Sequence, residues 1–271
     1  MIKGRKMDMF RIIDSHCHVY PEKIADKATA ATGNFYDIPI DCRGTVNTLK
    51  NEMEAAGIEI SIIQSVATSP KQVSSINNFI AEEVKTNNCF VGLGTLHPDS
   101  ENIEKDVNEI VSLGLKGVKL HPDIQNFKVD DERCLRIYEC CEQKKLPILI
   151  HTGDHRYDNS NPNRLKKVLE MYEELIIIGA HFGGWSIWKE AAKELHKYKN
   201  LYVDTSSSLY AIDKSEALEI IMMYGEDKVL FATDFPMWNP KEELERFMNI
   251  DLTDIQREKI LFHNANELFN L

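Results

Sequence analysis

Short apolar runs rich in β-branched residues alternate with longer amphipathic segments along most of the chain. The amphipathic segments, among them KQVSSINNFIAEEVKT (71–86) and DERCLRIYECCEQKK (131–145), are long enough to form crossover helices. Strands that alternate with such helices pair in parallel. The apolar runs are FRIID (10–14), IEISIIQSV (58–66), CFVGLGTL (89–96), LKGVKL (115–120), LPILIH (146–151), LIIIGAH (175–181), LYVDT (201–205) and KVLFATD (228–234).

These eight runs in 271 residues predict an α/β fold, a closed (β/α)8 TIM barrel formed by a single domain over 1–271, since such a barrel takes about 250 residues. An open doubly wound sheet shows the same alternation, but no glycine-rich phosphate loop follows the first run. Residues 240–249 are predicted to form the last barrel helix and 252–271 a C-terminal helical extension. The first connection, 19–43, is predicted to be irregular, either a lid over the barrel mouth or a simple loop.

Polar residues recur where the apolar runs end. In DSHCH (14–18), alternation places His16 and His18 on one face and Ile13, Ser15 and Cys17 on the other. The carboxyl ends of barrel strands face one cavity, so side chains at these ends are expected to meet. The other candidates at run ends are Lys119, His121, His151, His181 and Asp234.

Imidazoles and a carboxylate that converge without paired thiolates suit Zn²⁺, Mn²⁺ or Fe²⁺ in a site with an open position. Any one of these His residues alone is explained equally well by a hydrogen bond to neighbouring backbone, and only their recurrence favours a shared site. The six Cys residues show no CxxC spacing. They are interpreted as reduced packing residues of a cytoplasmic protein.

Charge and hydropathy narrow the class of protein. A formal net charge of −11 argues against nucleic acid as a partner, because that binding depends on clustered Lys and Arg. No stretch approaches the roughly 20 apolar residues of a membrane span. The N-terminal MIKGRKMDMF lacks the apolar core of a signal peptide. We therefore expect a soluble protein that acts on a small-molecule substrate, without membrane association.

The motifs DSHCH, GVKLHP, ILIHTG, GAHFGG and FATDFP, in this order, resemble those of the amidohydrolase superfamily. More narrowly, the chain resembles the amidohydrolase-related branch that includes aminocarboxymuconate semialdehyde decarboxylase, and KILFHNANELFNL (259–271) is similar to the closing helix of that branch. TatD-like nucleases share the HxH pair but usually place a Glu on the fourth strand, which KGVKLHP lacks. The resemblance covers nearly the whole chain.

The resemblance implies roles for individual residues. His16, His18 and His151 would bind a divalent metal, and Asp234 would bind the metal or its water and accept a proton. His181 would be a second-metal ligand or an acid or base beside a single metal. Members with two metals often carry a carboxylated Lys on the fourth strand, where Lys119 stands, but GVKLHP also occurs in members expected to hold one ion. One ion, most simply Zn²⁺, is favoured here.

The first expectation for function is a metal-dependent hydrolase of an amide, lactone or ester. Bound Zn²⁺ lowers the pKa of water from 15.7 to about 7, Asp234 would take the proton and His181 would steady the oxyanion. A barrel that binds metal or ligand without turnover is a further alternative, but it does not require the carboxylate of Asp234. Enzymes of this kind often form dimers, so a homodimer is one possible assembly, and the sequence leaves the oligomeric state open.

The second expectation is a metal-dependent, non-oxidative decarboxylase of an aromatic or unsaturated acid. It needs a cation for the substrate carboxylate, and Arg43, Arg156 and Arg164 lie in plausible mouth loops. Decarboxylases of the branch tend to be longer than this chain, which favours hydrolysis. Lys119 and His121 are predicted substrate or metal neighbours, and the predicted walls for a flat substrate are Trp185, Trp188, Phe235, Met237 and Trp238.

Overall fold

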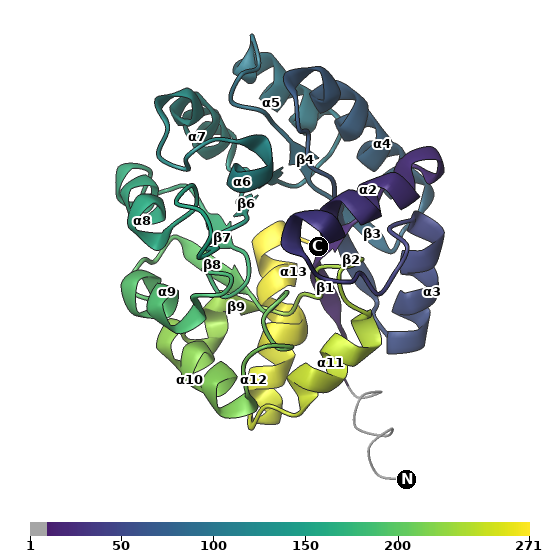
Figure 1. Cartoon of the computed structure of the whole chain (residues 1–271), viewed down its shortest axis with the longest axis vertical. Coiled ribbons are helices and arrows are strands. Elements are labelled where there is room, and N and C mark those ends of the chain that lie inside the picture. Colours follow the sequence, from purple (N-terminus) through teal and green to yellow (C-terminus); the bar gives the residue numbers. More distant parts are fainter. Residues whose placement is uncertain (1–9) are drawn as a thin grey trace.

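The structure is a computed structural model that describes residues 10–271, so residues 1–9 of the N-terminal segment discussed above lie outside it. Parallel strands form an inner ring and helices surround them (Figure 1). The predicted parallel α/β barrel is confirmed. The strands are β1 (Ile13–His18), β2 (Ile60–Gln64), β3 (Phe90–Gly92), β4 (Gly94–Thr95), β5 (Val118–Leu120), β6 (Ile148–Ile150), β7 (Ile177–Gly179), β8 (Leu201–Asp204) and β9 (Val229–Leu230).

The strands form two ladders, β1-β2-β3 and β4 to β9, which join into a ring. The single run predicted at 89–96 divides at Leu93 into β3 and β4. The N–H of Leu93 donates to the carbonyl of Ile63 on β2, whereas the N–H of Gly94 donates to the carbonyl of Gly117, just before β5. On the other side, the N–H of Ser15 donates to Phe231 and that of Asp234 donates to His16. These bonds tie β1 to the segment that follows β9 and close the barrel.

A β-bulge in β1 corrects the predicted alternation. Asp14 pairs with Ser61 and Cys17 pairs with Ile63, so β1 contains one more residue than β2 between these pairs. Ile13 packs inside the barrel, whereas Cys17 packs in the outer layer. The prediction that both side chains share a face is therefore wrong, because the extra residue reverses the alternation before His16.

The predicted crossover helices form close to their expected limits. The prediction that the first connection is irregular is wrong. Residues Glu22–Tyr36 form α2, a helix in which only Ala25 is buried. The helices are α2, α3 (Val46–Ala56), α4 (Val73–Thr86), α5 (Ile103–Ser112), α6 (Pro122–Gln125), α7 (Glu132–Lys144), α8 (Pro162–Met171), α9 (Trp188–Leu195), α10 (Lys214–Tyr224) and α11 (Pro240–Met248), with short 3-10 turns at Pro70–Gln72 and Glu226–Lys228.

The C-terminal helical extension is present as α12 (Asp254–Glu258), a π-helical turn (Lys259–His263) and α13 (Asn264–Phe269). Figure 1 shows α13 within the outline of the helical ring. Phe262, Ala265 and Phe269 pack against the apolar side chains inside the barrel, among them Ile13 and Leu230. This apolar layer forms a floor below the polar strand ends. No helix of residues 10–271 combines the length and apolar character needed to cross a bilayer.

Candidate metal centre

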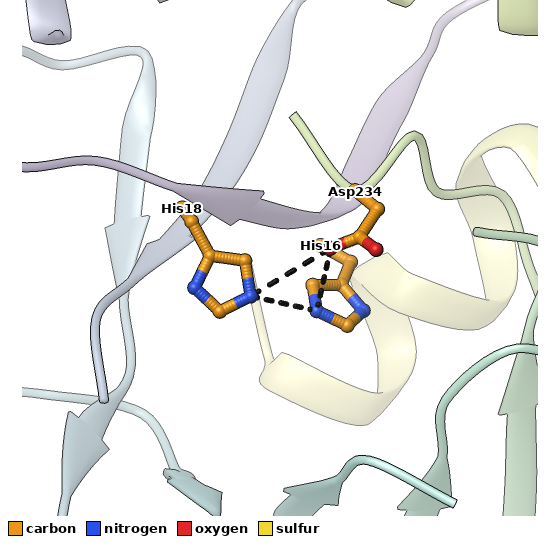
Figure 2. Close-up of side chains that lie close together, drawn as sticks. All are labelled: His16, His18 and Asp234. Carbon is orange, nitrogen blue, oxygen red and sulfur yellow. Dashed lines mark hydrogen bonds and ion pairs between the residues drawn. The ribbon is translucent and has the colours of Figure 1, made fainter. Parts of the chain in front are cut away.

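Three predicted metal ligands meet at the carboxyl ends of the strands. His16 and His18 extend from β1, and Asp234 points toward them from the segment after β9 (Figure 2). The Nε2 atoms of the two imidazoles are 3.1 Å apart. Asp234 Oδ1 lies 3.4 Å from Nε2 of His16 and 3.7 Å from Nε2 of His18. All three side chains are wholly or largely buried.

Buried acceptors fix the ring tautomers around this cluster. The Nδ1 atom of His16 is 2.9 Å from Oδ2 of Asp204, so the Nδ1–H donates to this carboxylate and Nε2 keeps its lone pair. In the same way, Nδ1 of His181 donates to the carbonyl of Ser206 at 3.0 Å. Nε2 of His151 is 3.5 Å from Oδ2 of Asp123. His16 and His181 thus turn an unprotonated nitrogen toward the centre, whereas the buried Nε2 of His151 makes no hydrogen bond.

The spacing of these atoms fits a bound cation. Four ligands at about 2.1 Å from a tetrahedral Zn²⁺ are separated from one another by about 3.4 Å. The three separations in the His16, His18 and Asp234 cluster, 3.1, 3.4 and 3.7 Å, bracket that value. The lone pair on Nε2 of His16 and the carboxylate of Asp234 both face this centre, so a cation is a partner that the arrangement accommodates.

Burial sets the protonation of the cluster. It lowers the pKa of His16 and His18 well below the usual value, with further lowering by neighbouring positive charge, and it lowers the pKa of His181 to about 4. These imidazoles are therefore neutral at neutral pH and able to bind metal. Burial also raises the pKa of Asp234 to about 7, although its bond from Ser207 and the charge of Lys119 oppose the rise.

Lys119 is buried beside the cluster. Its side chain projects inward from β5, is 1% exposed, and places Nζ 3.1 Å from Nε2 of His16. Burial lowers the pKa of Lys119 to about 8, against the charges of Asp234 and Asp204 that raise it. An ammonium group at this position adds a donor and a positive charge next to the candidate metal ligands.

His151 belongs to a second group of candidate metal ligands, with His121 and Asp123. Its Nδ1 is 3.0 Å from Nε2 of His181, and its ring stacks on that of His121 with the centroids 4.1 Å apart and the planes 6° from parallel. Ligand atoms of His121, Asp123 and His151 lie within 4.8 Å of one another. Nitrogen atoms of parallel stacked rings lie side by side and do not converge on one point, so this group suits a cation less well than the first. Metal binding by His151 stays a prediction.

Helix α2 brings an unpredicted residue to the site. Tyr36, its last residue, lies 2.6 Å from Nε2 of His121 and 3.4 Å from Nδ1 of His151 through its hydroxyl oxygen. Nδ1 of His121 accepts from the N–H of Ile124, so its Nε2 carries the proton and donates to Tyr36. The first connection thus covers part of the barrel mouth, as in the lid alternative.

A cavity of about 690 Å³ runs from the metal-ligand cluster along α2. Its inner end includes His16, His18, Lys119, His181 and Asp234. None of the three arginines predicted to bind a substrate carboxylate lines it. Arg43 pairs with Glu22 and Asp26, Arg156 pairs with Asp154, and Arg164 pairs with Asp130 and Asp158, because each guanidinium finds a carboxylate on its own loop or a neighbouring helix.

Two of the three tryptophans predicted as walls for the substrate, Trp185 and Trp238, take different places. Trp185 lines a small pocket next to the main cavity and packs edge-on against Tyr36. Trp238 lies outside both cavities, which corrects its predicted role. Its indole N–H donates to Ser207 Oγ at 2.9 Å, and Ser207 donates to Oδ2 of Asp234 at 2.5 Å. Trp238 therefore supports the Asp234 carboxylate from behind.

The sequence patterns did not predict Asp204, Ser207 and Tyr36 as residues of the site. Asp204 is the last residue of β8, within the run LYVDT, so it carries the signal that marked the other candidates, a polar residue at the end of an apolar strand. Ser207 carries no such signal, since its role depends on how the loop after β8 folds back over Asp234. Tyr36 reaches the site only because residues 22–36 are helical.

Comparisons with known proteins identify the family to which this chain belongs. The sequence family described as Amidohydrolase matches residues 13–271. A gamma-resorcylate decarboxylase from Polaromonas sp. (strain JS666 / ATCC BAA-500) is 27% identical over 123 residues, which is 38% of this chain and 37% of that enzyme. The match to that relative thus spans little more than a third of its length.

Solved structures share the fold over nearly the whole chain. An uncharacterized TIM-barrel protein from Bordetella bronchiseptica has a TM-score of 0.80 at 22% identity, covering 96% of this chain and 99% of its own. A dihydroxybenzoic acid decarboxylase from Polaromonas sp. JS666, with bound manganese and the inhibitor 2-nitroresorcinol, has a TM-score of 0.73 at 18% identity, covering 97% and 98%. With the family match over residues 13–271, the chain belongs to the amidohydrolase family.

Proposed function

We propose that the protein is a metal-dependent, non-oxidative decarboxylase of a small aromatic or unsaturated acid. The observation that carries this proposal is the buried Lys119, whose Nζ lies 3.1 Å from a candidate metal ligand at the inner end of the cavity. Decarboxylation needs a cation that holds the substrate carboxylate beside the metal. Lys119 meets this need where the three arginines do not.

His16, His18 and Asp234 would hold the metal, with His151 or His181 beside it. A bound divalent cation would polarise the oxygens of the substrate acid and of a neighbouring hydroxyl group. Zn²⁺ is the ion expected from the donor set, and the manganese of the Polaromonas structure supports Mn²⁺ as an alternative. Lys119 would lose its contact with Nε2 of His16 if that nitrogen bound the metal, and its ammonium group would be free to pair with the substrate carboxylate.

The reaction breaks the bond between the carboxylate carbon and a ring or alkene carbon. The electron pair stays on that carbon, which takes a proton, and carbon dioxide leaves. We assign this proton to Asp234 or His181, which are buried at the inner end of the cavity. Ser207 and Trp238 hold the Asp234 carboxylate in place by the bonds described above. The apolar floor keeps water from that side of the site.

Hydrolysis remains the competing function, and one observation favours it. Within residues 10–271, no guanidinium group lines the main cavity, and a hydrolase of neutral amides or lactones needs no cation for a substrate carboxylate. Both reactions use the same metal ligands. They differ in whether Lys119 is required.

The experiment that separates them measures products and metal together. The protein, loaded in turn with Zn²⁺ and Mn²⁺, is incubated with dihydroxybenzoates, carboxyvanillate, lactones and N-acyl compounds. We expect carbon dioxide from an aromatic acid, and a Lys119→Met variant that keeps its metal but loses this activity. Hydrolysis of a lactone or amide without carbon dioxide release, unaffected by Lys119→Met, would refute the proposal.

A further inference from the structure

The outer half of the cavity is lined by one face of α2. Pro21, Ile24, Ala28, Ala31 and Phe35 all line it. Their spacing of three and four residues puts them on one side of the helix, with the polar Lys27 and Thr32 lining the cavity beside them. Apolar stripes of this kind normally pack against a protein core, yet only Ala25 of α2 is buried. Ile24 is 49% exposed even though it faces the cavity.

The opposite wall of the cavity also carries apolar side chains, beside the polar Ser65, Thr68, Gln72 and Ser75. Val66, Ile76, Phe79, Ile124 and Met237 line it from the loop after β2, from α4 and α6, and from the segment after β9. Apolar patches on two walls therefore face each other across a space that no described side chain fills. This space is continuous with the metal-ligand cluster, because His16, His18 and Asp234 line the same cavity.

The size of the cavity exceeds the need of a single-ring acid. A cavity of about 690 Å³ lies within the range of about 300–1,000 Å³ that holds drug-sized ligands. The stripe from Ile24 to Phe35 extends over about 16 Å at the helical rise of 1.5 Å per residue. Ala28 and Ala31, in its middle, keep the space open because their side chains are single methyl groups.

We propose that the substrate is an acid with an extended apolar arm, whose carboxylate head binds at the metal centre and whose arm lies along the α2 stripe. This inference rests on the proposed function for the head group and assigns the outer half of the cavity to the arm. Burial of the arm covers Ile24 and the apolar patch opposite, and it also orders α2, which few buried contacts hold. A single-ring acid without the arm leaves the stripe uncovered.

The test uses 2-hydroxybenzoates that carry a methyl, propyl, pentyl or heptyl chain at ring position 4, and a second series substituted at position 5. Their dissociation constants are measured by calorimetry on the Mn²⁺-loaded protein. We expect the affinity in at least one series to rise about fourfold for each methylene that the stripe buries. Ala28→Trp should abolish this dependence on chain length, and Ala31→Phe is a second variant that fills the same space.

The matched control is Ala30→Trp, since Ala30 is exposed on α2 and does not line the cavity. It should keep the dependence on chain length. Affinity that is independent of chain length in both series, or a dependence that neither Ala28→Trp nor Ala31→Phe reduces, would overturn the proposal. A third outcome would also overturn it: the wild-type protein is a dimer in solution, Ala28→Trp makes it a monomer, and the affinity does not depend on chain length. In that case a second copy of the chain would cover the stripe.

The same compounds keep this inference separate from the proposed function. Carbon dioxide release is measured in parallel with binding. Affinity that rises with chain length in the absence of carbon dioxide release would retain the apolar arm and refute decarboxylation. Carbon dioxide release with no effect of chain length on affinity would retain decarboxylation and refute the arm.

Discussion

The two ends of the cavity are built in different ways. At the inner end, buried side chains on strand ends are each held by a second partner, as His16 is by Asp204 and Asp234 is by Ser207. At the outer end, α2 is held mainly by polar contacts at its two ends. The comparison indicates that the chemistry resides on the rigid barrel, whereas the choice of substrate resides on a loosely attached helix.

The largest effect is expected at the inner end. His16→Ala removes a candidate metal ligand, so the metal content should fall to background and the turnover by more than about 10²-fold. In the wild-type protein, free metal at about 100 times its dissociation constant should stabilise the fold by about 2.7 kcal/mol. This gain should disappear in the variant. Metal analysis and thermal unfolding measure the two effects.

His196→Ala is the matched control, because His196 follows α9 and is exposed. It should keep the metal, the activity and the stabilisation by metal. A His16→Ala variant that binds metal as tightly as the wild type would contradict the assignment of the cluster.

Much of the inner end was predictable because strand ends obey a simple geometry. A polar residue that follows an apolar strand in a parallel barrel lies at the carboxyl-terminal mouth. The cavity at this mouth is lined by His16, His18, His181 and Asp234. Lys119 followed from the same rule. The bulge in β1 was not predictable, because the bulged residues carry no distinctive composition and the pairing with β2 is visible only in three dimensions.

A smaller effect is expected for the carboxylate behind His16. Asp204→Asn can still occupy the space but loses the charge that orients the Nδ1–H of His16. Partners of metal-binding His residues typically contribute about 10-fold to 100-fold in metal affinity. Competition with a chelating dye measures this quantity. The same change at exposed Asp251, which pairs with Lys214, should leave the affinity unchanged, and equal losses in both variants would contradict the account.

The outer end was the part that sequence patterns missed. Helix prediction from apolar periodicity assumes that the apolar stripe faces a core, and the segment EKIADKATAATGNFY offers mostly alanine there. The roles of Arg156 and Trp238 were missed for another reason. Their partners, Phe35 O for the first and Ser207 for the second, lie 121 and 31 residues away along the chain.

At the outer end, Arg156→Ala should loosen α2 without unfolding the barrel. The guanidinium donates to the carbonyl of Phe35 at 2.8 Å and lies over the Tyr36 and Trp185 rings. Loss of a charged hydrogen bond of about 1.5 kcal/mol raises local opening by roughly tenfold. Hydrogen exchange in residues 30–36 measures this effect. Arg164→Ala, which breaks pairs elsewhere, should leave that exchange unchanged.

The smallest effect is expected for Arg43→Ala. Arg43 binds Glu22 and Asp26 near the start of α2, but its side chain is 43% exposed and its partners more so. Exposed ion pairs contribute about 0–1 kcal/mol, so exchange in residues 22–28 should rise by less than about fivefold. An increase as large as that of Arg156→Ala would show that both ends of α2 hold it equally.

The central claim is that His16, His18 and Asp234 together bind a divalent cation. The most direct measurement is a crystal structure of the Zn²⁺-loaded protein with data collected on both sides of the zinc absorption edge. We predict an anomalous peak about 2.0–2.2 Å from Nε2 of both imidazoles and from a carboxylate oxygen of Asp234. A fully loaded protein with its anomalous peak elsewhere, and no peak among these three side chains, would contradict the account.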